Sequence, residues 1–145
     1  MREKVIEHIK ALFRAHQELA EILPSEAFGQ KLSIPSNTIG GQFWCLIGAR
    51  ESYAKAIKEN GWAGFSCSMP FESTTDKDKV LEILSQTDKD FEKVLKEIEW
   101  TEDRDDLLLD LLEHETQHQG QLIRYVYGLK YKFPKSWAER WALDE

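Results

Sequence analysis

The sequence of residues 101–128 is TEDRDDLLLDLLEHETQHQGQLIRYVYG, and this stretch decides the fold. Its apolar residues recur every three or four positions, which predicts one long amphipathic helix with a single buried side. The acidic residues that follow Thr101 suit a helix amino-terminus, where the helix dipole favours negative charge. We expect this helix to end at Gly128, and its apolar side needs partner helices to cover it.

Three further segments have the same helical period, and they cover about residues 2–23, 36–59 and 73–100. Pro24 ends the first, because proline cannot continue a helix. Ser36 or Asn37 can cap the start of the second, and Asn60 with the glycine after it ends that helix. Four amphipathic segments of similar length predict a four-helix bundle.

The chain is therefore expected to be a single all-α domain over residues 1–145, with no strand-like alternation and no internal repeat. Two of its connections hold about a dozen residues, which is more than simple helical hairpins need, so the topology is expected to depart from plain up-and-down. The C-terminal tail from Leu129 contains Trp137 and Trp141. We expect the tail to close with a short helical turn over one end of the bundle.

The amino-acid composition and net charge of the chain exclude several classes of partner. Hydrophobic residues make up 41% of the chain and charged residues 31%, as in an ordinary globular protein. The net charge of −7 argues against nucleic acid and against anionic membrane surfaces as partners. With two cysteines, no leader-like start and no long apolar run, we expect a reduced, cytoplasmic protein without a membrane segment.

The histidines of the fourth segment are the main functional signal. His114 and His118 are four residues apart, which places them one turn apart on one side of a helix. At 100° per residue, His114 lies near 340°, His118 near 20° and Glu115 near 80°, all within or beside the apolar stripe. Leaving such groups buried and unpaired costs about 1–3 kcal/mol each. Either a divalent metal or neighbouring side chains such as Gln121 must satisfy them.

One interpretation of this pattern is the zincin motif. His114-Glu115-x-x-His118 has two zinc ligands and a glutamate that serves as general base. Zincin catalytic domains also have a sheet that forms the substrate cleft and a third ligand further along the chain. The sequence predicts no such sheet, so a protease ranks third among the functions considered.

A second pattern, TIGGQFWCLIGARE at residues 38–51, lies in the second predicted helix. Together with His-x-x-x-His-x-Gly-Gln at residues 114–121, it resembles the DinB-like, or YfiT-like, family. The resemblance implies a four-helix bundle in a mirror variant of up-and-down topology, often a homodimer. It also implies one divalent ion, zinc or nickel, held by three histidines, of which His114 and His118 match two. Known members of the family include transferases that use low-molecular-weight thiols, and many members have no assigned activity.

The third family histidine should come from the second helix, but that helix contains none. The position aligned by eye is Cys45, and Gln42 is the alternative if the alignment is shifted by one turn. A cysteine thiolate binds zinc at about 2.3 Å, and a Cys-His-His site with an open position can activate water. Cysteine is equally common as a small buried apolar residue, and helical phase places Cys45 away from the packed stripe.

Arg50 and Glu115 are the remaining charged residues on buried stripes. We hypothesise that they form an ion pair across the bundle, which would explain the inward glutamate without catalysis. Alternatively, Arg50 extends its guanidinium to solvent along an apolar stem.

The predicted function is thus a small metal-dependent enzyme that binds its ion through His114, His118 and Cys45. Its small-molecule substrate would enter at an open coordination position, with Glu115 as candidate general base. The alternative is a non-catalytic, metal-free bundle that acts through oligomerisation or partner binding, and the missing histidine favours it.

Overall fold

The computed structural model describes residues 1–144, and within them the fold is all-α, as predicted. The α-helices are α1 (Arg2–Ile22), α2 (Ile39–Glu59), α3 (Lys77–Glu97), α4 (Glu102–Leu129) and α5 (Lys135–Trp141). Two short 3₁₀ helices, η1 (Ser25–Gly29) and η2 (Phe71–Thr75), lie in the connections. The helix predicted over residues 73–100 is shorter at both ends, because η2 forms a separate turn before it and the backbone becomes extended at Ile98.

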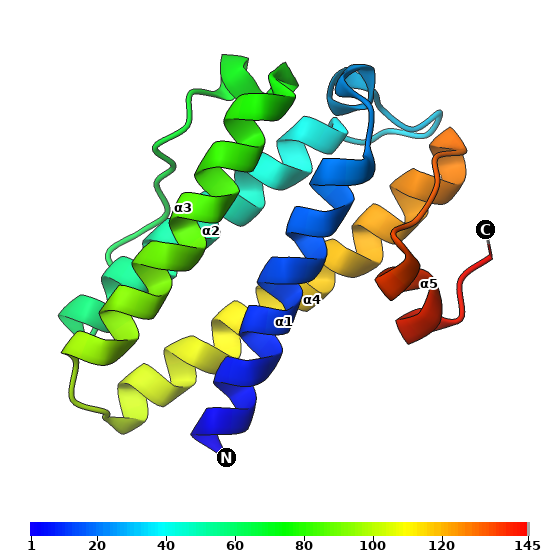
Figure 1. The fold of residues 1–145 in the computed structure, drawn as a ribbon. Helices are drawn as coiled ribbons and strands as arrows, with labels where there is room; N and C mark the ends of the chain where they lie inside the picture. Colours follow the sequence, from blue (N-terminus) through cyan, green and yellow to red (C-terminus); the bar gives the residue numbers. More distant parts are fainter. Residues whose placement is uncertain (145) are drawn as a thin grey trace.

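The four long helices are not arranged as consecutive antiparallel neighbours (Figure 1). α1 and α4 run in one direction, and α2 and α3 run in the other. α2 packs against α3 and α4, and α1 packs against the same two helices. The connection of residues 60–76 makes this order feasible, because it returns along α2, where Ser66 and Ser52 exchange hydrogen bonds of 2.9 and 3.1 Å.

The start and the end of α2 are fixed by local capping. Thr38 is its N-cap, and its Oγ1 accepts the N–H of Gly41 at 2.9 Å, so the predicted caps Ser36 and Asn37 are wrong. Asn60 ends α2 in the left-handed conformation with φ of 59°, as the Asn-Gly pair predicts. These two ends fix the rotation of α2, and therefore which of its polar side chains face the other helices.

The apolar core consists of two clusters, one toward each end of the bundle. The cluster at the end where α1 begins contains Ile9, Phe13, Ala56, Ile57, Phe91, Leu107, Leu108 and Leu111. The other cluster is larger, because η1, the segment before η2 and α5 add buried side chains such as Phe28, Met69 and Trp137 to it. Along every long helix, the residues of the two clusters are separated by at least one buried polar residue.

Gly40 marks the closest approach between α2 and its flanking loops. A Cβ added at Gly40 would meet the carbonyl oxygen of Thr74, and it would lie 2.8 Å from the carbonyl oxygen of Phe28. Both are backbone atoms, which cannot rotate away as a flexible side chain would. The small size of Gly40 therefore lets η1 and η2 pack onto the first turn of α2.

We predict that Gly40→Ala destabilises the protein by about 1–3 kcal/mol, because it overpacks this contact. The matched variant is Gly120→Ala, an exposed helical position where an added Cβ meets nothing within 4 Å. That change should stabilise the protein by up to about 1 kcal/mol through helix propensity. Urea unfolding of both variants measures the difference, and equal effects would contradict the packing argument.

Candidate metal centre and buried ion-pair layer

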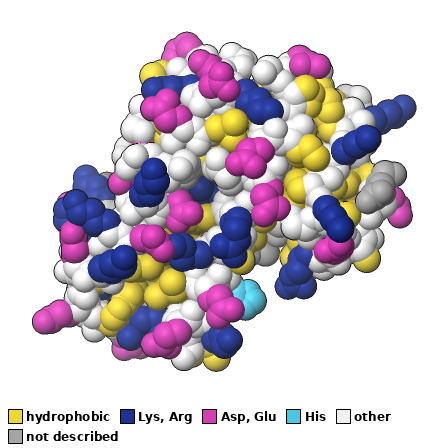
Figure 2. All heavy atoms as spheres, in the orientation of Figure 1, with side chains coloured by type: hydrophobic (Ala, Val, Ile, Leu, Met, Phe, Trp, Pro, Cys, Tyr) yellow, Lys and Arg dark blue, Asp and Glu magenta, His cyan; other side chains and the backbone are white. Residues whose placement is uncertain are grey.

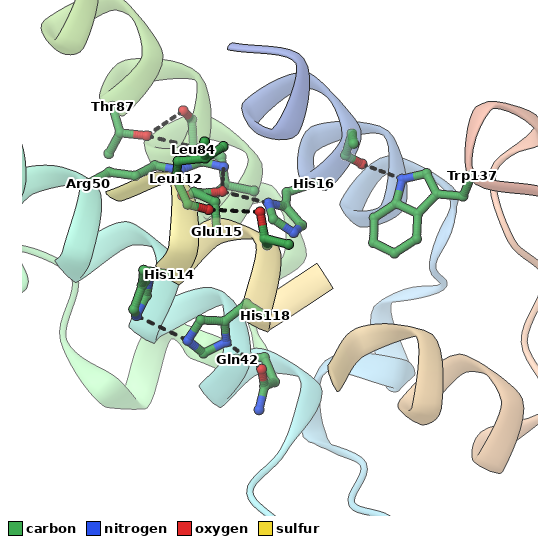
Figure 3. Close-up of polar contacts among 12 residues, drawn as sticks. His16, Gln42, Arg50, Leu84, Thr87, Leu112, His114, Glu115, His118 and Trp137 are labelled. Atoms are coloured by element: carbon green, nitrogen blue, oxygen red, sulfur yellow. Dashed lines mark hydrogen bonds and ion pairs between the residues drawn. The ribbon is translucent and has the colours of Figure 1, made fainter. Parts of the chain in front are cut away.

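Each long helix contributes one polar side chain to a layer at the middle of the bundle (Figure 3). These side chains are His16 from α1, Arg50 from α2, Thr87 from α3 and Glu115 from α4, and all four are buried. The layer lies between the two apolar clusters, so its members must satisfy one another.

The Arg50–Glu115 pair is the centre of this layer, and it confirms the ion pair hypothesised from helical phase. Arg50 Nε lies 2.7 Å from Glu115 Oε1 and Nη2 lies 3.1 Å from Oε2, which is a bidentate arrangement. The two side chains are 1% and 0% exposed, so the alternative in which Arg50 reaches solvent is wrong. Arg50 Nη1 also donates to Thr87 Oγ1 at 3.3 Å, and its Cζ lies 3.9 Å from the ring centroid of Phe13.

His16 completes the coordination of the carboxylate from the opposite side. Its Nδ1 lies 2.7 Å from Glu115 Oε2, and a carboxylate only accepts hydrogen bonds, so Nδ1 carries the hydrogen. Burial lowers the pKa of His16, and the opposing effect of Glu115 is smaller, so the ring is neutral at pH 7. Its Nε2 then holds a buried lone pair that has no hydrogen-bond partner within residues 1–144.

The electrostatics of Glu115 suit a structural anion. Burial by itself would raise the pKa of Glu115, but the charge of Arg50 and the hydrogen bonds from His16 and Arg50 lower it to about 2. Both oxygens are occupied and none of the side chain is exposed, so substrate cannot reach the carboxylate. The geometry thus gives this candidate general base an ion-pair role.

Sequence reasoning missed His16 and Thr87. The signal for His16 was present, because it follows Phe13 by three residues and precedes Ala20 by four on the buried side of α1. The same phase check that placed His114 inward would have found it. Thr87 had no comparable signal, since threonine is common on both faces of helices.

His114 and His118 form a separate group with Gln42, on the side of α4 that faces α2 (Figure 3). The two Nε2 atoms are 3.2 Å apart, and Nδ1 of His118 lies 2.6 Å from Oε1 of Gln42. The amide nitrogen of Gln42 donates to Asn37 Oδ1 at 3.0 Å and to Gln121 Oε1 at 2.8 Å. This orientation turns the amide oxygen of Gln42 toward His118. His118 therefore carries its hydrogen on Nδ1, and the lone pair of its Nε2 faces His114.

Both rings of the pair are held in the neutral form. Burial lowers the pKa of His118 to about 4, with a further contribution from neighbouring His114. Burial also lowers the pKa of His114. Metal ligation requires neutral imidazole, so the local environment prepares this pair for a metal at neutral pH.

The separation of the two nitrogens fits a shared metal ion. Zinc–nitrogen distances are about 2.0–2.1 Å, so two imidazoles on one tetrahedral ion place their nitrogens about 3.3 Å apart. The observed 3.2 Å between the Nε2 atoms agrees with this value. The hydrogen bond from His118 Nδ1 to Gln42 is also the second-shell contact that orients a metal-ligating histidine.

A third protein ligand does not join the pair. Within residues 1–144, no three His, Cys, Asp or Glu side chains converge as a metal site, so Cys45 does not lie with the two histidines. Cys45 is half-buried and lies near Cys67. Burial raises the pKa of both thiols, that of Cys67 to about 11, and favours their protonated forms. Gln42, the alternative from the sequence, contacts His118 on Nδ1, the nitrogen that faces away from His114.

An open cavity connects the pair to solvent. It has a volume of about 360 Å³ and is lined by Tyr53, Asp110, Glu113, His114 and Gln117. Two carboxylates at this opening favour the approach of a cation. The deeper His118 is 7% exposed, so access to the pair is from the side of His114.

Comparisons with family models and with curated proteins find no match for this chain. None of the helices within residues 1–144 has the length and apolar character that crossing a bilayer requires.

We predict that Glu115→Gln destabilises the protein by about 3–5 kcal/mol, because it leaves the Arg50 guanidinium buried without its counter-charge. Glu113→Gln, an exposed position two residues earlier on α4, is the control, and its effect should stay within about 0.5 kcal/mol. Thermal and urea unfolding measure both changes. Equal stability of the two variants would contradict a structural role for the Arg50–Glu115 pair.

Stability should also fall in mildly acidic solution. His118 has a pKa of about 4 in the folded chain, below its ordinary value of 6.5, so the unfolded chain binds this proton first. The free energy of unfolding is then constant above about pH 7 and decreases between about pH 6.5 and pH 4. Each such histidine contributes up to about 1.4 kcal/mol per pH unit in that window.

Urea unfolding at several pH values, with a chelator present, measures this slope. His118→Gln should reduce it, whereas His8→Gln, at an exposed position of α1, should retain it. A slope that His118→Gln leaves unchanged would show that the pKa of His118 is not depressed by folding.

Proposed function

We propose that the chain is a DinB-like protein that binds one divalent metal ion, zinc or nickel, through Nε2 of His114 and His118. The observation that carries this proposal is the 3.2 Å separation of the two Nε2 atoms, which face each other one turn apart on α4. The motifs at residues 38–51 and 114–121 support the family assignment. The parallel order of α2 and α3, joined by a long connection, agrees with the expected variant of up-and-down topology.

The proposed activity is a metal-dependent transfer or hydrolysis on a small molecule, in a reduced, cytoplasmic setting. A divalent ion held by the pair would supply Lewis acidity and would lower the pKa of a bound water or thiol. Gln42 fixes the tautomer of His118, so that Nε2 is available. Asp110 and Glu113 form the acidic rim of the entrance. Glu115 acts indirectly, because its ion pair with Arg50 holds α2 and α4 in register.

The second candidate is a metal-free bundle that acts by association, as a homodimer or with a partner. The absence of a third ligand near the pair, within residues 1–144, favours this candidate. Exposed aromatic side chains on the connection after α2 and on η2 add to it, since Trp62, Phe65 and Phe71 are each about half exposed. Phe65 and Phe71 both pack against Trp44, with ring centroids 5.3 and 5.6 Å apart.

Calorimetric titration of tag-free, chelator-treated protein with Zn²⁺ and Ni²⁺ separates the two candidates. We expect one ion per chain, with binding lost in His114→Ala and in His118→Ala. His8→Ala is the matched control and should bind as the native protein does. Gln42→Leu should weaken binding by about tenfold to a hundredfold, as loss of a second-shell partner does.

Cys45→Ala tests the ligand predicted from sequence, and the structure leads us to expect unchanged affinity. Metal binding that survives His118→Ala would contradict the proposed site. A folded protein that takes up neither ion would favour the association candidate, and light scattering would then determine its oligomeric state.

A further inference from the structure

A second cavity lies on the side of α4 opposite to the histidine pair, between α1, α4 and α5. Its volume is about 420 Å³, within the range of small-molecule sites. The residues that matter for its chemistry are Leu12, Arg14, Gln119, Trp137, Arg140 and Trp141. Figure 2 shows the face with α1 and α5, where hydrophobic side chains reach the surface among charged ones.

We propose that this cavity binds a small planar aromatic carboxylate. The inference rests on the walls of the cavity, on an amide that borders it, and on the local charge. It does not depend on metal binding at His114 and His118.

The walls are flat and apolar. Trp137 is 1% exposed and is held in place by a hydrogen bond from its Nε1 to the carbonyl oxygen of Ala15 at 2.9 Å. Trp141 stands at the rim, 43% exposed, and the guanidinium of Arg140 lies 4.4 Å from the centroid of its ring. Leu12 and Leu112 contribute aliphatic surface to the same cavity. Such walls suit a planar ring that stacks or packs edge-on.

Gln119 gives the cavity a polar group on its lining. The residue is 5% exposed and lines the cavity, and its amide atoms reach the accessible space of the cavity rather than being sealed from it. An amide that borders a cavity is free to form hydrogen bonds with water or with a bound molecule. An amide donates through its nitrogen, so a carboxylate oxygen of a ligand would satisfy it.

The charge of the cavity is opposite to that of the whole chain. The chain carries a net charge of −7, but the cavity is lined by two arginines and by a single carboxylate, Glu18. Neither Arg14 nor Arg140 forms an ion pair with another described side chain. Glu18 already accepts a hydrogen bond from the hydroxyl of Ser136. Two unpaired guanidinium groups beside an apolar wall select a carboxylate over a cation.

Calorimetric titration of chelator-treated protein with 2-naphthoate tests the proposal, with 2-naphthalenemethanol as the uncharged analogue. We expect saturable binding of one 2-naphthoate per chain and binding at least about tenfold weaker for the alcohol, since the charged contacts are lost. The double variant Arg14→Gln/Arg140→Gln should weaken 2-naphthoate binding by about tenfold or more. Arg124→Gln, at an exposed arginine of α4 outside the cavity, is the matched control and should bind normally.

Gln119→Leu should also weaken binding, and a melting curve establishes that it folds. If Gln119→Leu does not fold, the Arg14→Gln/Arg140→Gln variant still tests the proposal. Both of its positions are exposed, so these substitutions should leave the fold intact. His118→Ala should leave 2-naphthoate binding unchanged, which separates this site from the metal site. The proposal is overturned if 2-naphthoate, benzoate and indole-3-acetate all fail to bind at millimolar concentration. It is also overturned if the double variant binds as well as the control, or if the alcohol binds as tightly as the acid.

Discussion

The bidentate contact between Arg50 and Glu115 is the interaction on which the rest of the structure depends. Removing two charges from water is costly, and the cost is offset only when the charged groups themselves find hydrogen-bond partners. Here His16 and Thr87 supply the missing partners, so one residue from each long helix is required at the same level. Sliding any helix by one turn would leave a buried charge or a buried ring unpaired. The layer therefore specifies the register of the bundle more sharply than its apolar clusters can, because apolar contacts tolerate exchange of one leucine for another.

Helical periodicity was sufficient to predict the all-α class, the approximate bounds of the long helices and the Arg50–Glu115 pair, since each of these depends on positions within one helix or on two inward charges. Which helices become neighbours is a property of packing, and periodicity does not contain it. For that reason the sequence could propose Cys45 as a third ligand from alignment alone, whereas the structure places the thiol near Cys67. Likewise, His16 lay on a recognisable buried stripe, but only the assembled bundle shows that its partner is Glu115.

α4 has polar side chains on three of its sides, and the helical period separates the three groups. His114 and His118 face α2, Glu115 points into the centre, and Gln119 lies toward α1 and α5. The middle of this helix has many polar residues because each of the three sides contacts a different polar neighbour or cavity. Gln42 on the opposing helix contacts one histidine of the pair. The amide of Gln42 orients His118 through Nδ1, which leaves Nε2 of that ring facing His114.

The division of the core into two clusters affects how the molecule opens. The cluster around Ile9, Phe91 and Leu108 is covered by the four long helices and by the short connection between α3 and α4. The other cluster is also covered by η1, by the segment before η2 and by α5. A polar layer transmits packing strain between two apolar regions less directly than continuous side-chain interdigitation does. We therefore expect the end with fewer covering elements to exchange its amide hydrogens at lower free energy than the other end. The opening lined by Tyr53, Asp110 and His114 lies near the middle of α4, and we expect local opening of the less covered end to widen it while the other end stays folded.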